Sequence, residues 1–220
     1  MDSLPDRSLE SFAYERHAAR LILVLYVGGE RSQGLFDGET YLFDSFTRLG
    51  RFDFWVREPG HLALALLDAL KYKPARLSDQ QDALRSILDG LLRTANAEVH
   101  RVALPGTAYK PWGISGEMNL ILSNLASRAV ISDRPSFTKG GSHQIVLETR
   151  GIALAHQILA EAPSFAWYHQ QCQIVRDFWH ILDSYDLAAM PYLGMSPVAA
   201  ASTPLISVIQ KRYDEQFQQF

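Results

Sequence analysis

Cysteine is almost missing from this sequence, because Cys172 is the only one among 220 residues. A disulfide within the chain is therefore excluded, which fits a reducing compartment. Long apolar runs are missing as well: the longest, Leu21 to Val27, is far shorter than the roughly 20 residues that span a bilayer. The first residues, with Asp2, Pro5 and Asp6, do not have the pattern of a signal peptide. We therefore expect a cytoplasmic protein with no membrane contact.

A strong excess of basic charge is also missing, since Lys and Arg number 21 against 24 Asp and Glu. Residues 1–98 carry 12 basic and 15 acidic side chains, and residues 151–220 carry three and six. Only residues 99–150 are basic, with six against three. A net charge of +3 is modest for binding to phosphates. Two interpretations stay open for this segment, namely a weak anion contact and a chance imbalance on a solvated surface.

The signatures of common catalytic sites are missing too. The glycine-rich run 28–34 lacks the Gly-Lys-Ser/Thr ending of a phosphate loop, and 113–116 lacks the glycine spacing of a nucleophile elbow. His169 and Cys172 have a spacing that can hold a metal, but no second ligand pair accompanies them, so a helix surface is the favoured interpretation. We expect a protein that is not an enzyme, with no catalytic residue, no metal and no cofactor.

Apolar side chains recur at helical spacing over most of the chain. The pattern predicts a helix over 8–27, a loop over 28–38, and a helix that begins at Asp37 or Thr40 and runs to Val56. A new helix can begin at Pro59, since proline is tolerated in a first turn, and continue over 61–70. Further helices are expected from Ser78 to 91, from Ser115 to 125, from Thr149, over 163–184 and from about Pro204. Residues 98–104 are typical of a short strand.

Asp53 lies between Phe52 and Phe54, four residues before Arg57. Two alternatives are open for its carboxylate: an ion pair with Arg57 on the helix surface, or a role as a helix cap or in a pair across the core.

The segment 115–154 carries most of the interpretation. A helix ends near Val130, β-like runs follow at 130–134 and 143–148 around a glycine-rich tip, and another helix begins at Thr149. This order is typical of a winged helix, with a recognition helix before the hairpin called the wing. The predicted fold is mostly α with a small β-hairpin (α+β). We expect 1–98 to be the N-terminal helical part of the winged-helix domain, 99–162 the recognition helix, wing and following helix, and 163–220 a C-terminal helical extension.

A recognition helix and a wing can contact DNA through polar and basic side chains. The candidates on these elements and on the turn before them are Lys110, Ser115, Asn119, Arg134, Lys139 and His143. As a DNA-binding pattern this set is weak, because the helix carries Glu117 and no basic residue before Arg128.

Two stretches carry a family resemblance: Arg-Leu-Gly-Arg-Phe-Asp-Phe-Trp-Val-Arg-Glu-Pro at 48–59, and Tyr-Lys-Pro-Trp at 109–112, before the helix and wing. They resemble the small winged-helix middle components encoded beside SMC-like ABC ATPases in bacterial three-component defence systems of the Lamassu type, over roughly residues 10–165. The family pattern has lysine at position 51 and glycine at position 110. The resemblance implies a non-catalytic subunit that docks on the ATPase and helps couple DNA sensing to an effector, often a nuclease.

The C-terminal extension is rich in aromatic side chains at near-helical spacing. We name Trp167, Trp179, Tyr213 and Phe217 as candidates for partner binding, because aromatics are common interface hot spots. The alternative is that they form the core of the extension, and the last helix can equally pack down or enter a partner's groove.

A second function is open for the same fold. A winged-helix transcription regulator would bind DNA as a homodimer, with its two recognition helices about 34 Å apart. The adaptor hypothesis predicts instead a stable complex with the ATPase and weak or no binding to DNA alone.

Overall fold

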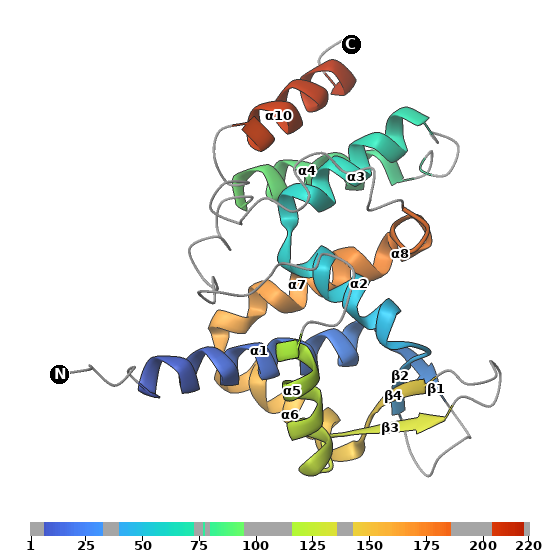
Figure 1. Ribbon diagram of the computed structural model, residues 1–220. Coiled ribbons are helices and arrows are strands. Elements are labelled where there is room, and N and C mark those ends of the chain that lie inside the picture. The colour runs from blue at the N-terminus through green and yellow to red at the C-terminus, as the bar shows by residue number, and fades with distance from the viewer. Residues whose placement is uncertain are drawn as a thin grey trace. The chain divides into compact units, whose positions relative to one another are not determined.

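The computed structural model describes residues 7–32, 40–72, 77, 80–94, 116–135, 143–185 and 204–217. Helices make up most of them (Figure 1): α1 (Arg7–Gly28), α2 (Phe46–Arg57), α3 (Pro59–Tyr72), α4 (Gln81–Thr94), α5 (Gly116–Ser127), α6 (Thr149–Glu161), the 3-10 turn η3 (Pro163–Phe165), α7 (Ala166–Asp177), α8 (Trp179–Leu182) and α10 (Pro204–Phe217). The strands are β1 (Glu30–Ser32), β2 (Thr40–Phe43), β3 (Ile131–Pro135) and β4 (His143–Leu147). The predicted α+β class, mostly helical with a small β component, is confirmed. No described helix is long and apolar enough to cross a membrane.

The strands form one antiparallel sheet in the order β1-β2-β4-β3. The hairpin that the sequence predicts is β3 and β4, whose register places Ile131 opposite Leu147 and Pro135 opposite His143. On its other edge β4 pairs with β2, where Phe43 lies opposite Ile145. Strand β4 therefore pairs with a neighbour on each side, and its residues Ile145 to Leu147 are buried.

The sequence predicts a loop over 28–38 and a helix from Asp37 or Thr40, but the structure has strands β1 and β2 in this region, so this prediction is wrong. Thr40 begins β2, while Asp37 lies outside the described residues. The helix begins only at Phe46, where the hydroxyl of Ser45 accepts the backbone N–H of Arg48 at 3.2 Å, which is the geometry of an N-cap. The periodicity misled because Phe43 continues the spacing of the helix by chance, whereas its strand partners lie about 100 residues away.

The chain forms two compact units, each built from two segments: unit 1 is Met1–Asp53 with Trp112–Arg176, and unit 2 is Phe54–Pro111 with Asp177–Phe220. The boundary falls inside α2 and again at the end of α7. The predicted division by sequence order, with limits after residues 98 and 162, stays a prediction.

Helix α1 is the centre of unit 1. It packs against α5, α6, β2 and β4 (Figure 1). Because neighbours meet it on several sides, the run from Leu21 to Leu25 is at most 2% exposed, and the helix has no single apolar stripe in this part. The sequence predicts a stripe, since periodicity reports one covered face and not several.

Unit 2 is organised around α3, which packs against α4 and α10. Pro59 occupies the first turn of α3, where a proline costs no helical hydrogen bond, as the sequence predicts. Nearly all of α3 is buried, and α4 contributes Leu84, Leu88 and Leu91 at helical spacing. Helix α10 adds Ile209 and Tyr213.

Candidate interaction surfaces

Helix α5 is the element that the sequence analysis singles out as a recognition helix. It buries an apolar stripe, Met118, Ile121, Leu122 and Leu125, against its own unit. Each such side chain contributes roughly 1.5–3 kcal/mol of burial. The opposite face is exposed and carries Asn119, Leu120, Ser123, Ala126 and Ser127. Asn119 and Ser123 therefore lie outward, as the sequence predicts.

The turn after α5 fixes how the hairpin leaves the helix. The N–H of Val130 donates to the carbonyl of Leu125 at 2.9 Å, and the N–H of Ala129 donates to Ala126 at 3.0 Å. This pair of bonds is a Schellman motif, and Val130 and Leu125 supply its usual apolar contact. Ala129 takes the left-handed position with φ 54°, where glycine is the usual residue.

Helix α6 closes against this turn at Gly151. A Cβ on Gly151 would lie 2.4 Å from the carbonyl oxygen of Val130 and 2.4 Å from Leu147, so only glycine fits without a shift. The same carbonyl accepts the N–H of Glu148 at 3.0 Å. The end of α5, the hairpin and the start of α6 thus form one tightly joined structure.

On the hairpin, the guanidinium of Arg134 is already occupied. It donates to Glu148 at 2.5 Å and to the hydroxyl of Ser132 at 2.8 Å, and Ser132 also donates to Glu148. This triad ties the two strands together at the base of the wing. The Arg134 charge would have to leave a carboxylate in order to contact DNA.

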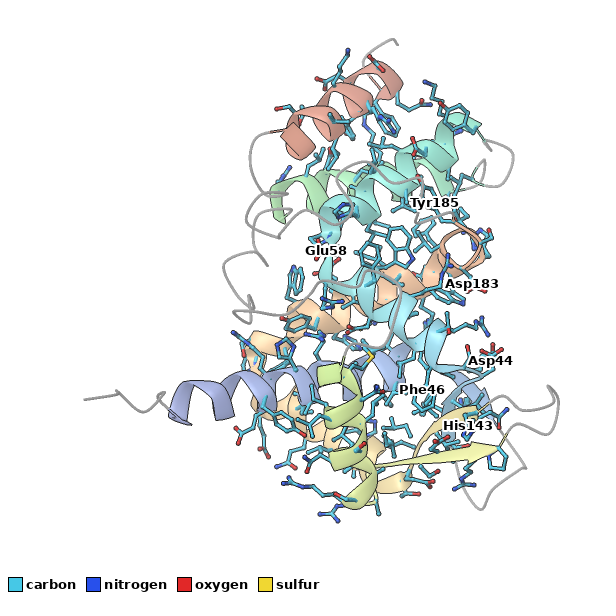
Figure 2. All side chains as sticks on the ribbon, viewed as in Figure 1. Asp44, Phe46, Glu58, His143, Asp183 and Tyr185 are labelled. Atoms are coloured by element: carbon cyan, nitrogen blue, oxygen red, sulfur yellow. The ribbon has the colours of Figure 1, made fainter. Side chains whose placement is uncertain are left out.

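The imidazole of His143 is occupied in a similar way. Its Nδ1 lies 2.8 Å from a carboxylate oxygen of Asp133, and its ring lies 6.4 Å from that of Phe46 (Figure 2). Asp133 and His143 are both about half exposed. Two of the predicted DNA contacts, Arg134 and His143, are therefore matched by acidic neighbours. Three others, Lys110, Ser115 and Lys139, lie outside the described residues or side chains.

Two exposed arginines near the same turn differ from these. Arg128 follows the last residue of α5, and Arg150 belongs to the first turn of α6. Arg150 donates to the backbone carbonyl of Arg128 at 2.9 Å. Within the part of the chain that the structure describes, neither guanidinium forms an ion pair with a carboxylate. Nothing in the sequence spacing of Arg128 and Arg150 indicates that they meet.

A buried charged cluster holds α1 to α2. Arg20 donates to Asp53 at 2.8 Å and approaches Nδ1 of His17 at 2.5 Å. Their exposed fractions, 4%, 1% and 7%, place the cluster in the interior, where an unpaired charge is costly. Of the roles open for Asp53, the pair across the core is therefore the observed one. No local pattern indicates that Arg20 is the partner of Asp53, because the two residues are 33 positions apart in the sequence.

The aromatic candidates of the C-terminal part fall into two groups. Tyr213 is 8% exposed, and Phe217 packs on the ring of Tyr213 and on the guanidinium of Arg85. Burial raises the pKa of Tyr213, and a hydrogen bond to Asp89 raises it further. Both side chains thus hold α10 within unit 2. Trp167 and Trp179 are half-buried, so part of each ring faces solvent.

Asp68 provides the polar part of this α10 contact. Its carboxylate accepts the hydroxyl of Tyr185 at 2.6 Å and pairs with Arg212 of α10. Tyr185 in turn meets the indole of Trp55 edge-on, with ring centroids 5.8 Å apart (Figure 2 labels Tyr185). The last helix is therefore seated by one salt bridge as well as by apolar burial.

Among the described residues, no group of three or more His, Cys, Asp or Glu side chains is placed to hold a metal ion. Cys172 is fully buried on α7 and His169 is half-buried. The chain matches no protein-family model, no curated protein and no solved structure among those with which it was compared.

Proposed function

We propose that this protein is a winged-helix adaptor subunit without catalytic activity that docks on an SMC-like ABC ATPase in the cytoplasm. It helps couple DNA sensing by that ATPase to an effector, often a nuclease, in bacterial anti-phage defence of the Lamassu type. The observation that carries the proposal is the order of elements in unit 1, and the sequence resemblance at 48–59 and 109–112 supplies the partner.

A winged helix has three helices and a small antiparallel sheet. A strand after the first helix pairs with the second strand of the wing, and the third helix leads into the wing. In unit 1 the order α1, β2, α2, α5, β3, β4 and the part β2-β4-β3 of the sheet correspond to this arrangement, while β1 adds a fourth strand beside β2. The chain leaves unit 1 within α2, after Asp53, and residues 54–111 belong to unit 2. The adaptor is thus a winged helix with an insertion between its second and third helices. The inserted residues 54–111 and the C-terminal residues 177–220 together form unit 2.

The docking surface for the ATPase is best assigned to Trp167. Tyr213 and Phe217 are used inside unit 2, so replacing them would disturb folding before binding. Trp167 lies on α7 with its ring edge-on to buried Tyr168, at 4.9 Å between centroids, which fixes an aromatic group that still faces solvent. A fixed, partly exposed tryptophan is the kind of side chain that dominates interfaces.

The test is co-purification from the native operon with a tag on this protein. The proposal expects the ATPase in a fixed ratio, and at least a tenfold loss of affinity in Trp167→Ala, as for an interface hot spot. Tyr72→Ala is the matched control, since it removes an aromatic that is 70% exposed. Failure to recover the ATPase with the unaltered protein would refute the adaptor function.

The second candidate is a transcription regulator, and one observation favours it: the uncharged, hydrogen-bonding outer face of α5. It predicts a homodimer in solution and binding to the promoter of its own operon. Light scattering that shows a strict monomer, together with no retention of promoter DNA, would remove this alternative.

A further inference from the structure

The basic side chains of unit 1 differ in whether their charge is already matched. Arg20 pairs with Asp53, Arg48 with Glu30 and Asp44, and Arg134 with Glu148. Arg128 and Arg150 are exposed and form no ion pair within the described part of the chain. Two exposed arginines without a carboxylate partner in the described part of the chain therefore meet where α5 ends and α6 begins.

Both arginines belong to a hydrogen-bonded part of the backbone. Arg128 lies within the Schellman turn, so the position from which its side chain leaves the backbone is set. The guanidinium of Arg150 is held at 2.9 Å from the carbonyl of Arg128 by one donor, and its other N–H groups stay available because a guanidinium has five. The nearest acidic position in sequence, Glu148, is occupied by Arg134 and Ser132.

A stripe of small polar side chains leads along α5 to this pair. Asn119, Ser123 and Ser127 follow one another at intervals of four, and all three are exposed. At 1.5 Å per residue the stripe is about 12 Å long, the length of three to four base-pair steps.

We propose that Arg128 and Arg150 form a phosphate-binding site for duplex DNA, with the stripe Asn119–Ser123–Ser127 facing the major groove beside it. Guanidinium groups match phosphate oxygens in geometry, and phosphate contacts fix the position of a helix on the duplex. An acidic protein segment is the less suitable partner, because the amide and hydroxyl groups of the stripe can hydrogen-bond to the base edges that only a duplex presents. The inference goes beyond the docking function and does not depend on it.

The experiment measures binding of the purified full-length chain to a 20-base-pair duplex by fluorescence anisotropy, in a salt series that starts at about 50 mM. Each phosphate contact contributes about 0.9 to the slope of log K against log salt, so Arg128→Gln with Arg150→Gln is expected to lower the slope by about 2. This contribution of each phosphate contact also predicts a loss of roughly tenfold in affinity for each arginine removed at the lowest salt. Arg128→Lys with Arg150→Lys is expected to keep most of the slope.

The matched control is Arg176→Gln, which removes one charge from an exposed position on α7 of the same unit. It is expected to leave the slope unchanged. An unaltered slope in the double Gln variant, an equal effect of the control, or no binding of the unaltered chain at 50 mM salt overturns the inference. So does tighter binding to polyglutamate than to the duplex. Pull-down of the ATPase with the double Gln variant tests docking separately, so either proposal can fail alone.

Discussion

Replacement of Ala129 by glycine is expected to stabilise this protein, although most substitutions destabilise. Ala129 holds φ 54° in the turn that joins α5 to β3. The left-handed conformation costs a residue with a Cβ roughly 1–2 kcal/mol, and glycine avoids that cost. Glycine also gains freedom in the unfolded chain, which offsets about 0.4–1 kcal/mol. The net expectation is a gain of roughly 0.5–1 kcal/mol in the free energy of unfolding.

Ala126→Gly is a control matched in chemistry and opposite in sign. Ala126 is exposed like Ala129 and lies three residues earlier, but it belongs to α5 itself. Glycine within a helix loses backbone freedom without relief of strain, which costs about 0.5–1 kcal/mol. The two variants make the same change of atoms, so the backbone conformation alone sets the difference of roughly 1–2 kcal/mol between them.

The assay is urea unfolding of the full chain followed by circular dichroism, with hydrogen exchange of the β3 amides as a local measure. The slope of the free energy against urea is expected to be equal in the three proteins, so the midpoints report stability directly. A midpoint of Ala129→Gly below that of the unaltered protein, or equal losses in both variants, would refute the conformational argument.

Other substitutions follow from the same packing. Asp53→Asn is expected to lower the free energy of unfolding by about 3–5 kcal/mol, because it leaves the buried guanidinium of Arg20 unmatched. The double variant Arg20→Met with Asp53→Leu should recover most of this loss. A free energy of unfolding of Asp53→Asn within about 1 kcal/mol of wild type contradicts the expectation. Gly151→Ala places a Cβ 2.4 Å from the Val130 carbonyl and should cost more than 1 kcal/mol, in contrast to the gain usual for alanine in a helix. Tyr213→Ala should lower the protection of α10 amides from exchange and leave α5 unaffected; equal loss in both helices would argue against two separate units.

Much of the fold can be predicted from local signals. The helices that begin at Pro59, Thr149 and Pro204 are each marked by a proline or a change of periodicity, and the structure has them at those residues. Strands β1 and β2 could not be predicted, because three to four residues carry little pattern and the pairing of β2 with β4 joins residues about 100 positions apart. The two discontinuous units are not visible in the sequence for the same reason.

The candidate surfaces show a similar limit. Exposure of Asn119 and Ser123 follows from the helical period of α5, so their outward positions could be predicted. The positions of Tyr213 and Phe217 could not be decided, since an aromatic stripe is equally suited to a core and to an interface. Burial of Tyr213 and the contact of Phe217 with Arg85 place both within unit 2.

Net charge describes the basic segment 99–150 poorly, because an arginine beside a carboxylate counts as much as a solitary one. Within this segment Arg134 is neutralised by Glu148, while Arg128 and Arg150 lie together without an acidic partner among the described residues. A phosphate responds to the local field and not to the sum, since charges beyond about 10 Å are largely screened at physiological salt. The modest total of the segment is therefore compatible with a strong local anion contact, and it should be at the turn after α5, with the base of the wing contributing little.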